Sequence, residues 1–384
     1  MSKACRILVV DDEVDVEPLV LQRMRREVRK GVYEFRFAHN GVEALEVLNE
    51  DESIDLVLSD INMPEMDGLD LLDQIPSVNP NIKSVIVSAY GDMKNIRTAM
   101  NRGAFDFVTK PIDFDDLRIT IDRTRKHLEM WRDALKARDR LVTLQNELGL
   151  AGDMQQSILP REFPHSDHFE IFAAMVPARD VGGDFYDVIR LNEEELGIAV
   201  ADVSDKGVAA AMFMMSSRSL LKGAAVGAVD PPAVLQEVND LLAVENETAM
   251  FVTICYAIFD HRAGILKYAN GGHNAPLLVR SDGTTEYLEM PPGFALGVVP
   301  GAEFHGQSID LGRDDFVLVY SDGVTEAANS SEEMFGEERL KELGSRHAGS
   351  GAESFCTAVL EAVHAFTGDA PQTDDITVMA LKRT

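Results

Sequence analysis

A chain of 384 residues is long enough for two domains, and its composition, 45% hydrophobic and 26% charged, is that of a globular protein. The formal net charge of -29 argues against nucleic-acid binding, which depends on neutralising phosphates with Lys and Arg. The longest unbroken apolar run, residues 208–215, is too short for a membrane span, and the N-terminal segment lacks a cleavable signal shape. We therefore expect a cytoplasmic protein that binds neither nucleic acid nor membrane.

Short apolar runs alternate with helical patterns over residues 1–125. The runs lie at 7–10, 56–59, 85–87 and 105–109, and the helical patterns at 17–30, 41–49, 69–75 and 94–102. This alternation predicts a doubly wound α/β domain with a parallel sheet. Ligands of such folds bind in the crevice beyond the carboxyl ends of the strands.

Each of these runs ends in a charged or reactive residue, namely Asp11 with Asp12, Asp60, Ser88 and Lys110. Any one of these acids alone is more readily explained as a helix N-cap. Several convergent carboxylates repel one another unless a hard divalent cation lies among them. Ligation by oxygen alone suits Mg²⁺, which accepts phosphate as a further ligand. The sequence therefore predicts a magnesium site that handles a phosphoryl group.

At these residues the segment resembles a response-regulator receiver domain, and the loop Met63-Pro64-Glu65-Met66-Asp67-Gly68 also fits that family. The resemblance implies a five-stranded parallel sheet and phosphoryl transfer from a cognate histidine kinase to Asp60. It implies that Mg²⁺ is bound by Asp11, Asp12, Asp60 and the carbonyl of Asn62. It also implies that the hydroxyl of Ser88 moves towards the phosphoryl group and that the ring of Phe107 follows it. Lys110 would bind the phosphoryl group.

A helical connector is predicted over residues 126–160, beginning as the last helix of the first domain. Apolar positions follow alternating steps of four and three, at Leu117, Ile121, Thr124, Leu128, Trp131, Leu135, Arg138 and Val142, with polar interruptions at Thr124 and Arg138. This spacing favours pairing of two helices in a homodimer, and an isolated solvated helix is the alternative. A glycine break is expected before a second, short helix over residues 154–159, which would transmit the signal.

Residues 161–384 have a different pattern, with many alternating or apolar strands joined by hairpin signals. Helical patterns are confined to 209–223, 232–245, 337–346 and 352–367. Mostly antiparallel strands with clustered helices predict a layered α+β domain.

Four short stretches of this domain place an acid at a strand boundary. They contain Asp184, Asp202, Asp322 and the pair Asp374-Asp375. Each alone is more often a turn, but together they predict a site of carboxylates, carbonyls and water for two Mn²⁺ or Mg²⁺ ions. Such a site hydrolyses a phosphomonoester directly. The three cysteines agree with this, because none is followed by the arginine of a Cys-x5-Arg phosphate loop.

These stretches resemble the PPM-type serine/threonine phosphatases, in particular the SpoIIE/RsbU-like branch, over about residues 150–384. The resemblance implies that Asp202 bridges two metals beside the carbonyl of Val203, that Asp322 and Asp374 hold one ion, and that Asp184 serves the other. The motif leaves open whether Asp375 shares the role of Asp374. His273 lies in a Gly-His-Asn loop that we read as a structural turn, with a role as proton donor as the alternative. Asp205 stands where the branch usually has glycine.

The combined reading is a two-component response regulator whose Asp60 phosphorylation controls a metal-dependent phosphatase. The resemblance implies a phosphoserine or phosphothreonine protein substrate of the anti-sigma-factor antagonist type. The alternative is a binding adaptor that captures a partner without turnover, which would predict a lost metal acid. A transcription factor is disfavoured by the acidic balance and by the lack of a helix-turn-helix pattern.

Overall fold

A computed structural model describes residues 4–227, 230–244 and 246–384. The last residue of the predicted helix 232–245 and the first three residues of the N-terminal segment lie outside the described residues. The chain forms two compact units, Met1–Val142 and Thr143–Thr384. Within the described ranges, no helix is long and apolar enough to cross a bilayer.

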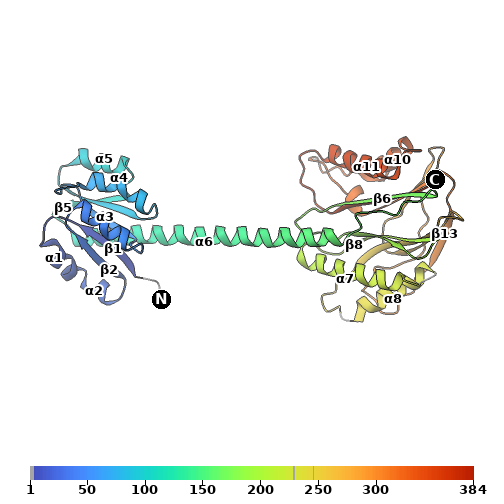
Figure 1. Ribbon diagram of the computed structural model, residues 1–384, viewed down its shortest axis with the longest axis horizontal. Coiled ribbons are helices and arrows are strands. Elements are labelled where there is room, and N and C mark those ends of the chain that lie inside the picture. Colours follow the sequence, from blue (N-terminus) through green and yellow to red (C-terminus); the bar gives the residue numbers. More distant parts are fainter. Residues whose placement is uncertain (1–3, 228–229, 245) are drawn as a thin grey trace. The chain divides into compact units, whose positions relative to one another are not determined.

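The first unit is the predicted α/β domain (Figure 1). Its parallel sheet has the order β2-β1-β3-β4-β5. The strands are β1 (Cys5–Val10), β2 (Tyr33–Ala38), β3 (Leu56–Asp60), β4 (Lys83–Ala89) and β5 (Asp106–Lys110). The helices are α1 (Val16–Arg23), α2 (Arg25–Arg29), α3 (Gly41–Glu50), α4 (Gly68–Val78), α5 (Met93–Asn101) and the start of α6 (Phe114–Ile158). The helical pattern predicted at 17–30 is divided into α1 and α2 at Met24.

Helix α6 is continuous from Phe114 to Ile158, so the predicted glycine break is wrong. Gly149 and Gly152 are both helical, because each glycine weakens a helix by only about 1 kcal/mol. Gly149 is exposed, whereas Gly152 is buried against the backbone of Asp180. The first four heptad positions, from Leu117 to Leu128, are buried within the first unit. From Trp131 onward most side chains of the helix are exposed.

The second unit consists of two antiparallel sheets between two helical layers (Figure 1), as predicted for a layered α+β domain. The sheet orders are β13-β10-β9-β8-β7 and β12-β11-β14-β15-β6. The strands are β6 (Phe169–Val176), β7 (Phe185–Arg190), β8 (Glu195–Val203), β9 (Val252–Asp260), β10 (Ile265–Gly271), β11 (Leu277–Val279), β12 (Thr285–Tyr287), β13 (Gly306–Asp310), β14 (Phe316–Tyr320) and β15 (Ile376–Arg383). The helices are α7 (Val208–Ala225), α8 (Pro231–Val244), α9 (Asp322–Thr325), α10 (Gly336–Arg346) and α11 (Ala352–Thr367).

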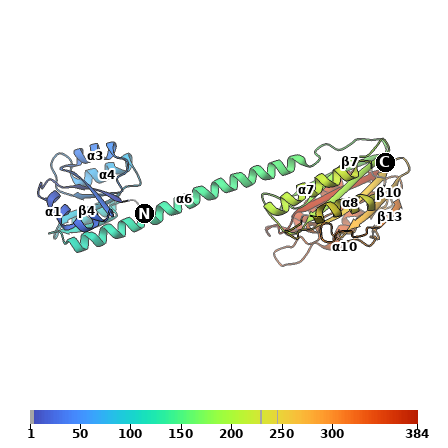
Figure 2. The ribbon, with the colours of Figure 1, turned by 90° about the horizontal axis from the view of Figure 1, so that it is seen from below.

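The core of this unit lies between the sheets and continues under the helices. Phe259 of β9 and Met379 of β15 belong to one buried cluster, which also contains Met214 of α7. A second cluster joins the opposite face of β14 and β15 to α11, through Phe316 and Phe355. Figure 2 shows α7 and α8 lying over the sheet that contains β7 and β10. This packing brings the ends of β7, β8, β14 and β15 together.

Candidate functional site

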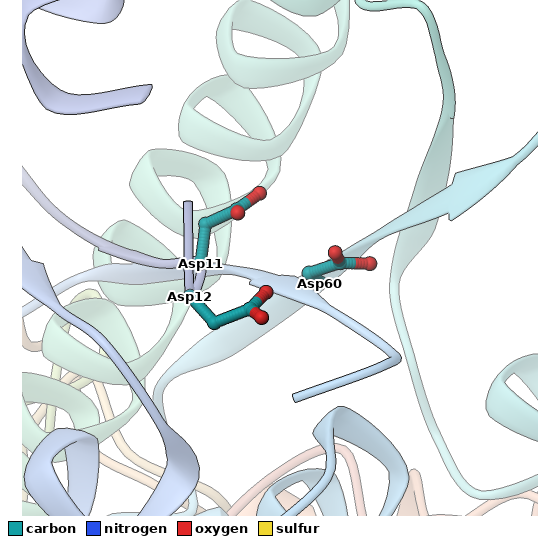
Figure 3. Close-up of side chains that lie close together, drawn as sticks. All are labelled: Asp11, Asp12 and Asp60. Carbon is teal, nitrogen blue, oxygen red and sulfur yellow. The ribbon is translucent and has the colours of Figure 1, made fainter. Parts of the chain in front are cut away.

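The acids of the first unit meet because their strands are neighbours in register. Val10, at the end of β1, pairs with Ser59 of β3, so Asp11 and Asp12 follow one strand where Asp60 ends the next. One oxygen from each carboxylate lies within 4.8 Å of the others. Figure 3 shows the three side chains facing a common space. Asp11 and Asp60 are buried and Asp12 is exposed, so a cation held there would keep contact with water.

Lys110 extends from the end of β5 into this acid cluster. Its Nζ lies 2.6 Å from Oδ2 of Asp60 and 2.9 Å from Oδ2 of Asp11. A third acid, Glu13, lies 3.4 Å from the same nitrogen and was not among the predicted residues. Burial lowers the pKa of Lys110, but the hydrogen bonds and charges of Asp60 and Asp11 outweigh it and raise the pKa. The ammonium group therefore stays charged and balances part of the negative charge.

The other predicted residues of the first unit lie in the two strands beyond β3 and in the loop that follows Asp60. Ser88 lies in β4 on the strand beside β3, and its Oγ is buried with no hydrogen-bond partner in the part of the chain that the structure describes. Phe107 is 37% exposed and Asn62 is exposed. A Cβ at Gly68 would lie 2.0 Å from the carbonyl oxygen of Asp60, which explains the glycine that ends the loop after Asp60.

In the second unit, four acids come from four separate segments. Asp184 directly precedes β7, and Ala201 of β8 pairs with Phe185, so Asp184 and Asp202 lie at the same end of one sheet. Asp322 begins α9 just after β14, and Asp374 precedes β15 at the neighbouring end of the other sheet. A Cβ at Gly323 would lie 2.0 Å from the carbonyl of Asp375. The Asp322-Gly323 pair therefore begins a helix packed against the start of β15, and is not a hairpin turn.

Mutual repulsion connects these four acids. Burial raises the pKa of Asp184 well above its usual range, and the charge of Asp202 adds to the effect. Burial and then the charge of Asp322 raise the pKa of Asp202 to about 7. Burial and the charge of Asp374 raise that of Asp322 in turn. Oδ2 of Asp184 is buried and lacks a hydrogen-bond partner among the described residues. Carboxylates in this condition fit cation ligands.

The four acids spread more widely than those of the first unit. Among the residues that the structure describes, only the trio in the first unit offers three ligand oxygens that all lie within 4.8 Å of one another. A wider arrangement suits two ions about 3.5–4 Å apart better than one ion.

Asp374 and Asp375 differ in their contacts. Oδ1 of Asp375 accepts the amide of Ala178 at 2.8 Å, and Oδ2 accepts those of Gly183 at 2.6 Å and Asp184 at 3.3 Å. Oδ2 of Asp374 instead lies 2.8 Å from Nζ of Lys206. Asp375 therefore holds the loop that carries Asp184, whereas Asp374 faces a cation. Lys206 was not among the predicted residues.

His273 is buried and belongs to a turn. Its amide donates to Oδ1 of Asn270 at 2.9 Å, and its Nδ1 lies 2.9 Å from Oγ1 of Thr253. Burial lowers the pKa of His273 to about 4, so the imidazole is neutral near pH 7. This agrees with its interpretation as a structural residue.

Two families match the chain. The response regulator receiver domain matches residues 7–122. Stage II sporulation protein E (SpoIIE) matches residues 192–384, which is half of the chain. The chain belongs to the SpoIIE family. It joins a receiver domain to a SpoIIE-type phosphatase domain, as the motifs indicated.

Known proteins resemble the chain over the SpoIIE-family part and beyond it. Protein IcfG of Synechocystis is 31% identical over 62% of this chain, which spans 41% of that protein. Phosphoserine phosphatase RsbU of Bacillus subtilis is 27% identical over 62% of this chain and 71% of its own length. The SiaA-PP2C domain of Pseudomonas aeruginosa shares the fold, with a TM-score of 0.57 at 24% identity, over 63% of this chain and 98% of that domain.

Proposed function

We propose that this protein is a response regulator in which phosphorylation of Asp60 controls a metal-dependent protein serine/threonine phosphatase. The observation that carries the proposal is the group of four acids in the second unit. Burial raises the pKa of three of them, Asp184, Asp202 and Asp322, and one buried oxygen of Asp184 has no hydrogen-bond partner among the described residues. Membership of the SpoIIE family and likeness to a phosphoserine phosphatase support the reaction type.

In the proposed phosphatase site, Asp202 and the carbonyl of Val203 would hold two Mn²⁺ or Mg²⁺ ions, with Asp184 contributing to one ion and Asp322 and Asp374 to the other. We assign this role to Asp374 because both oxygens of Asp375 already accept backbone amides. Bound divalent cations polarise a phosphoryl oxygen and lower the pKa of a bound water, which supplies hydroxide near neutral pH.

In the proposed receiver site, Asp60 accepts the phosphoryl group from a cognate histidine kinase in the cytoplasm. Asp11, Asp12, Asp60 and the carbonyl of Asn62 would hold Mg²⁺, and the acid trio supports this assignment. Lys110 is close enough to Asp60 to neutralise charge on an attached phosphoryl group. The unpartnered Oγ of Ser88 is free to bond to that group, and exposed Phe107 is free to follow it.

Coupling between the domains would pass through α6. Within the first unit, Arg132 of this helix lies 2.6 Å from Asp55, the residue before the strand that ends in Asp60. Within the second unit, Nε2 of Gln155 donates to the carbonyl of Gly182 at 2.6 Å, and the amide of Gly182 donates to Oε1 of Gln155 at 2.9 Å. Gly182 is two residues from Asp184, so a movement of the helix would reach a proposed ligand.

We also propose that α6 pairs with its copy in a homodimer. Exposed apolar side chains along residues 126–160, the proposed connector, support this. They are Met130, Trp131, Leu141, Val142, Leu144, Leu150 and Met154. Of these, Trp131 and Val142 occupy predicted heptad positions, which a paired helix would bury and a lone helix leaves in water. The phosphatase domain would then begin at about residue 161 and the receiver would end at about 125.

The substrate we propose is a small phosphoserine or phosphothreonine protein of the anti-sigma-factor antagonist type, as the family resemblance implies. The direct test is hydrolysis of such a phosphoprotein in Mn²⁺ by the full chain. Asp322→Ala should lose activity by several orders of magnitude. Equal activity of this variant and the parent protein would disprove the proposal.

Control by the receiver is tested with beryllofluoride or an acyl phosphate. The parent protein should change its rate, and Asp60→Asn should not respond. A response that persists in Asp60→Asn would refute the coupling. A binding adaptor would give a different result. The parent chain would then bind the phosphoprotein without hydrolysing it, and Asp184→Ala would no longer bind it.

A further inference from the structure

An apolar pocket adjoins the acid site of the second unit. It has a volume of about 480 Å³, within the range of ligand pockets. One face of α11 forms a wall, with Leu360, Val363 and Thr367 at helical spacing. Ile376 of β15 also lines the pocket, and so do Ala327 and Ala370, whose side chains are small.

The pocket and the acid site share residues. Gly323, next to Asp322, and Asp374 both line the pocket. The loop before β15 is fixed there, because Nε2 of Gln372 donates to the carbonyl of Val176 at 2.9 Å and to that of Asp374 at 2.7 Å. An occupant of the pocket therefore contacts residues that also form the proposed metal site.

We propose that this pocket binds the apolar side chains that flank the phosphoserine of the substrate protein. The inference rests on the proposed phosphatase function and adds a specificity site to it. A phosphoserine at the acids places its neighbours within reach, since each residue of an extended chain spans about 3.3–3.6 Å. The acids recognise only the phosphoryl group, which every phosphoprotein carries, whereas the pocket distinguishes an apolar neighbour from a polar one.

The test uses two synthetic phosphoserine peptides with the full chain in Mn²⁺, with and without beryllofluoride. One peptide carries leucine at the two positions on each side of the phosphoserine, and the other carries glutamine there. The parent protein should show a kcat/KM at least about tenfold higher for the leucine peptide, which is the order expected for burying one leucine side chain. The difference should appear mainly in KM, since the reacting group is the same.

Two variants reduce the pocket and one serves as control. Ala370→Trp fills the space and Thr367→Arg places a charge at its wall, so both should bring the ratio between the peptides close to one. Ala365→Trp, on the exposed side of the same helix, should keep the ratio of the parent protein. Unfolding temperature and turnover of p-nitrophenyl phosphate report whether each variant keeps its fold and its metal site.

The outcomes separate this inference from the function on which it rests. A parent protein that turns over p-nitrophenyl phosphate and both peptides with equal kcat/KM overturns the pocket assignment alone. The pocket assignment also fails if both pocket variants keep the preference for leucine. A parent protein that hydrolyses none of the three compounds overturns the proposed function, and the pocket assignment with it.

Discussion

The ammonium group of Lys206 lies 2.8 Å from Oδ2 of Asp374, and it also donates to the carbonyl of Thr373. Lys206 follows the segment that contains Asp202 and Val203, whereas Asp374 lies in the loop before β15. A side-chain cation therefore joins two separate segments of the proposed metal site. At the proposed site, the lysine would compete with a metal ion for the same carboxylate.

We expect Lys206→Gln to bind Mn²⁺ more tightly. The side chain of Lys206 is 36% exposed, so water screens the ion pair and its contribution is about 0.5–1 kcal/mol. The dissociation constant should fall by roughly two- to fivefold. Titration calorimetry of the metal-free protein measures it, with Lys222→Gln, an exposed lysine of α7, as control. Weaker binding by Lys206→Gln alone would show that the lysine supports the site.

Asp205→Gly should stabilise the protein. Asp205 has a φ of 67°, in the left-handed region where a Cβ is strained and glycine is favoured. The free energy of unfolding should rise by about 0.5–1 kcal/mol, measured in urea. Asp205→Asn removes the charge but keeps the strain, so its stability should stay near that of the parent protein. A gain in Asp205→Asn as large as in Asp205→Gly would point to charge repulsion as the cause.

Two glycines of α6 should respond to alanine in opposite ways. A Cβ at Gly149 meets nothing within 4 Å, whereas one at Gly152 would lie 2.1 Å from the carbonyl of Asp180. Gly149→Ala should raise the free energy of unfolding by about 0.5–1 kcal/mol through helix propensity. Gly152→Ala should lower it by about 1–3 kcal/mol, because the helix end must move away from the second unit. Equal gains in both variants, by thermal unfolding, would contradict this packing.

The metal-free protein should lose stability as pH rises. In the folded state the pKa of Asp202 is raised from 3.8 to about 7, so the folded protein holds a proton that the unfolded chain releases. Stability from this proton is therefore present at low pH and is lost as pH rises towards 7 and above. Between pH 6 and 8 the loss from Asp202 is on the order of 1 kcal/mol.

Saturating Mn²⁺ should remove most of this pH dependence and raise the unfolding temperature, because the ion binds only the folded state. At a Mn²⁺ concentration 100 times the dissociation constant, one site adds about 2.7 kcal/mol to the free energy of unfolding. Asp202→Asn should unfold with a weaker pH dependence in the metal-free state. Unfolding temperatures at pH 6 and 8 with and without Mn²⁺ provide the check. Equal pH dependence of the parent protein and Asp202→Asn without metal would contradict the assignment; the comparison with the variant cancels the opposite contribution of the buried, neutral His273.

The fold class could be predicted because it depends on local patterns. The buried strand Leu56–Asp60 begins with three apolar residues, and its apolar run was found together with the acid that ends it. Strand β2, at the sheet edge, was not recognised as an apolar run because Glu34 and Arg36 interrupt it. The continuity of α6 was missed because the position of Gly152 depends on a contact with Asp180, 28 residues away in the second unit.

The site was predictable as a set of residue types but not as a set of contacts. The motif could not distinguish Asp374 from Asp375, because the difference lies in which carboxylate faces the amides of Ala178 and Gly183. Lys206 and Glu13 were missed because a single charge has no pattern, and only the fold brings each to its partner.

Asp375 also links cation binding to completion of the domain. Its carboxylate accepts the backbone amide of Asp184, although Asp375 lies 191 residues further along the chain, directly before the last strand. A partly folded chain lacks this hydrogen bond. The acids of the proposed metal site are then far apart and would bind cations weakly. Divalent ions would therefore bind the completely folded domain in preference to partly folded chains. Their binding would thus report that the last strand is in place.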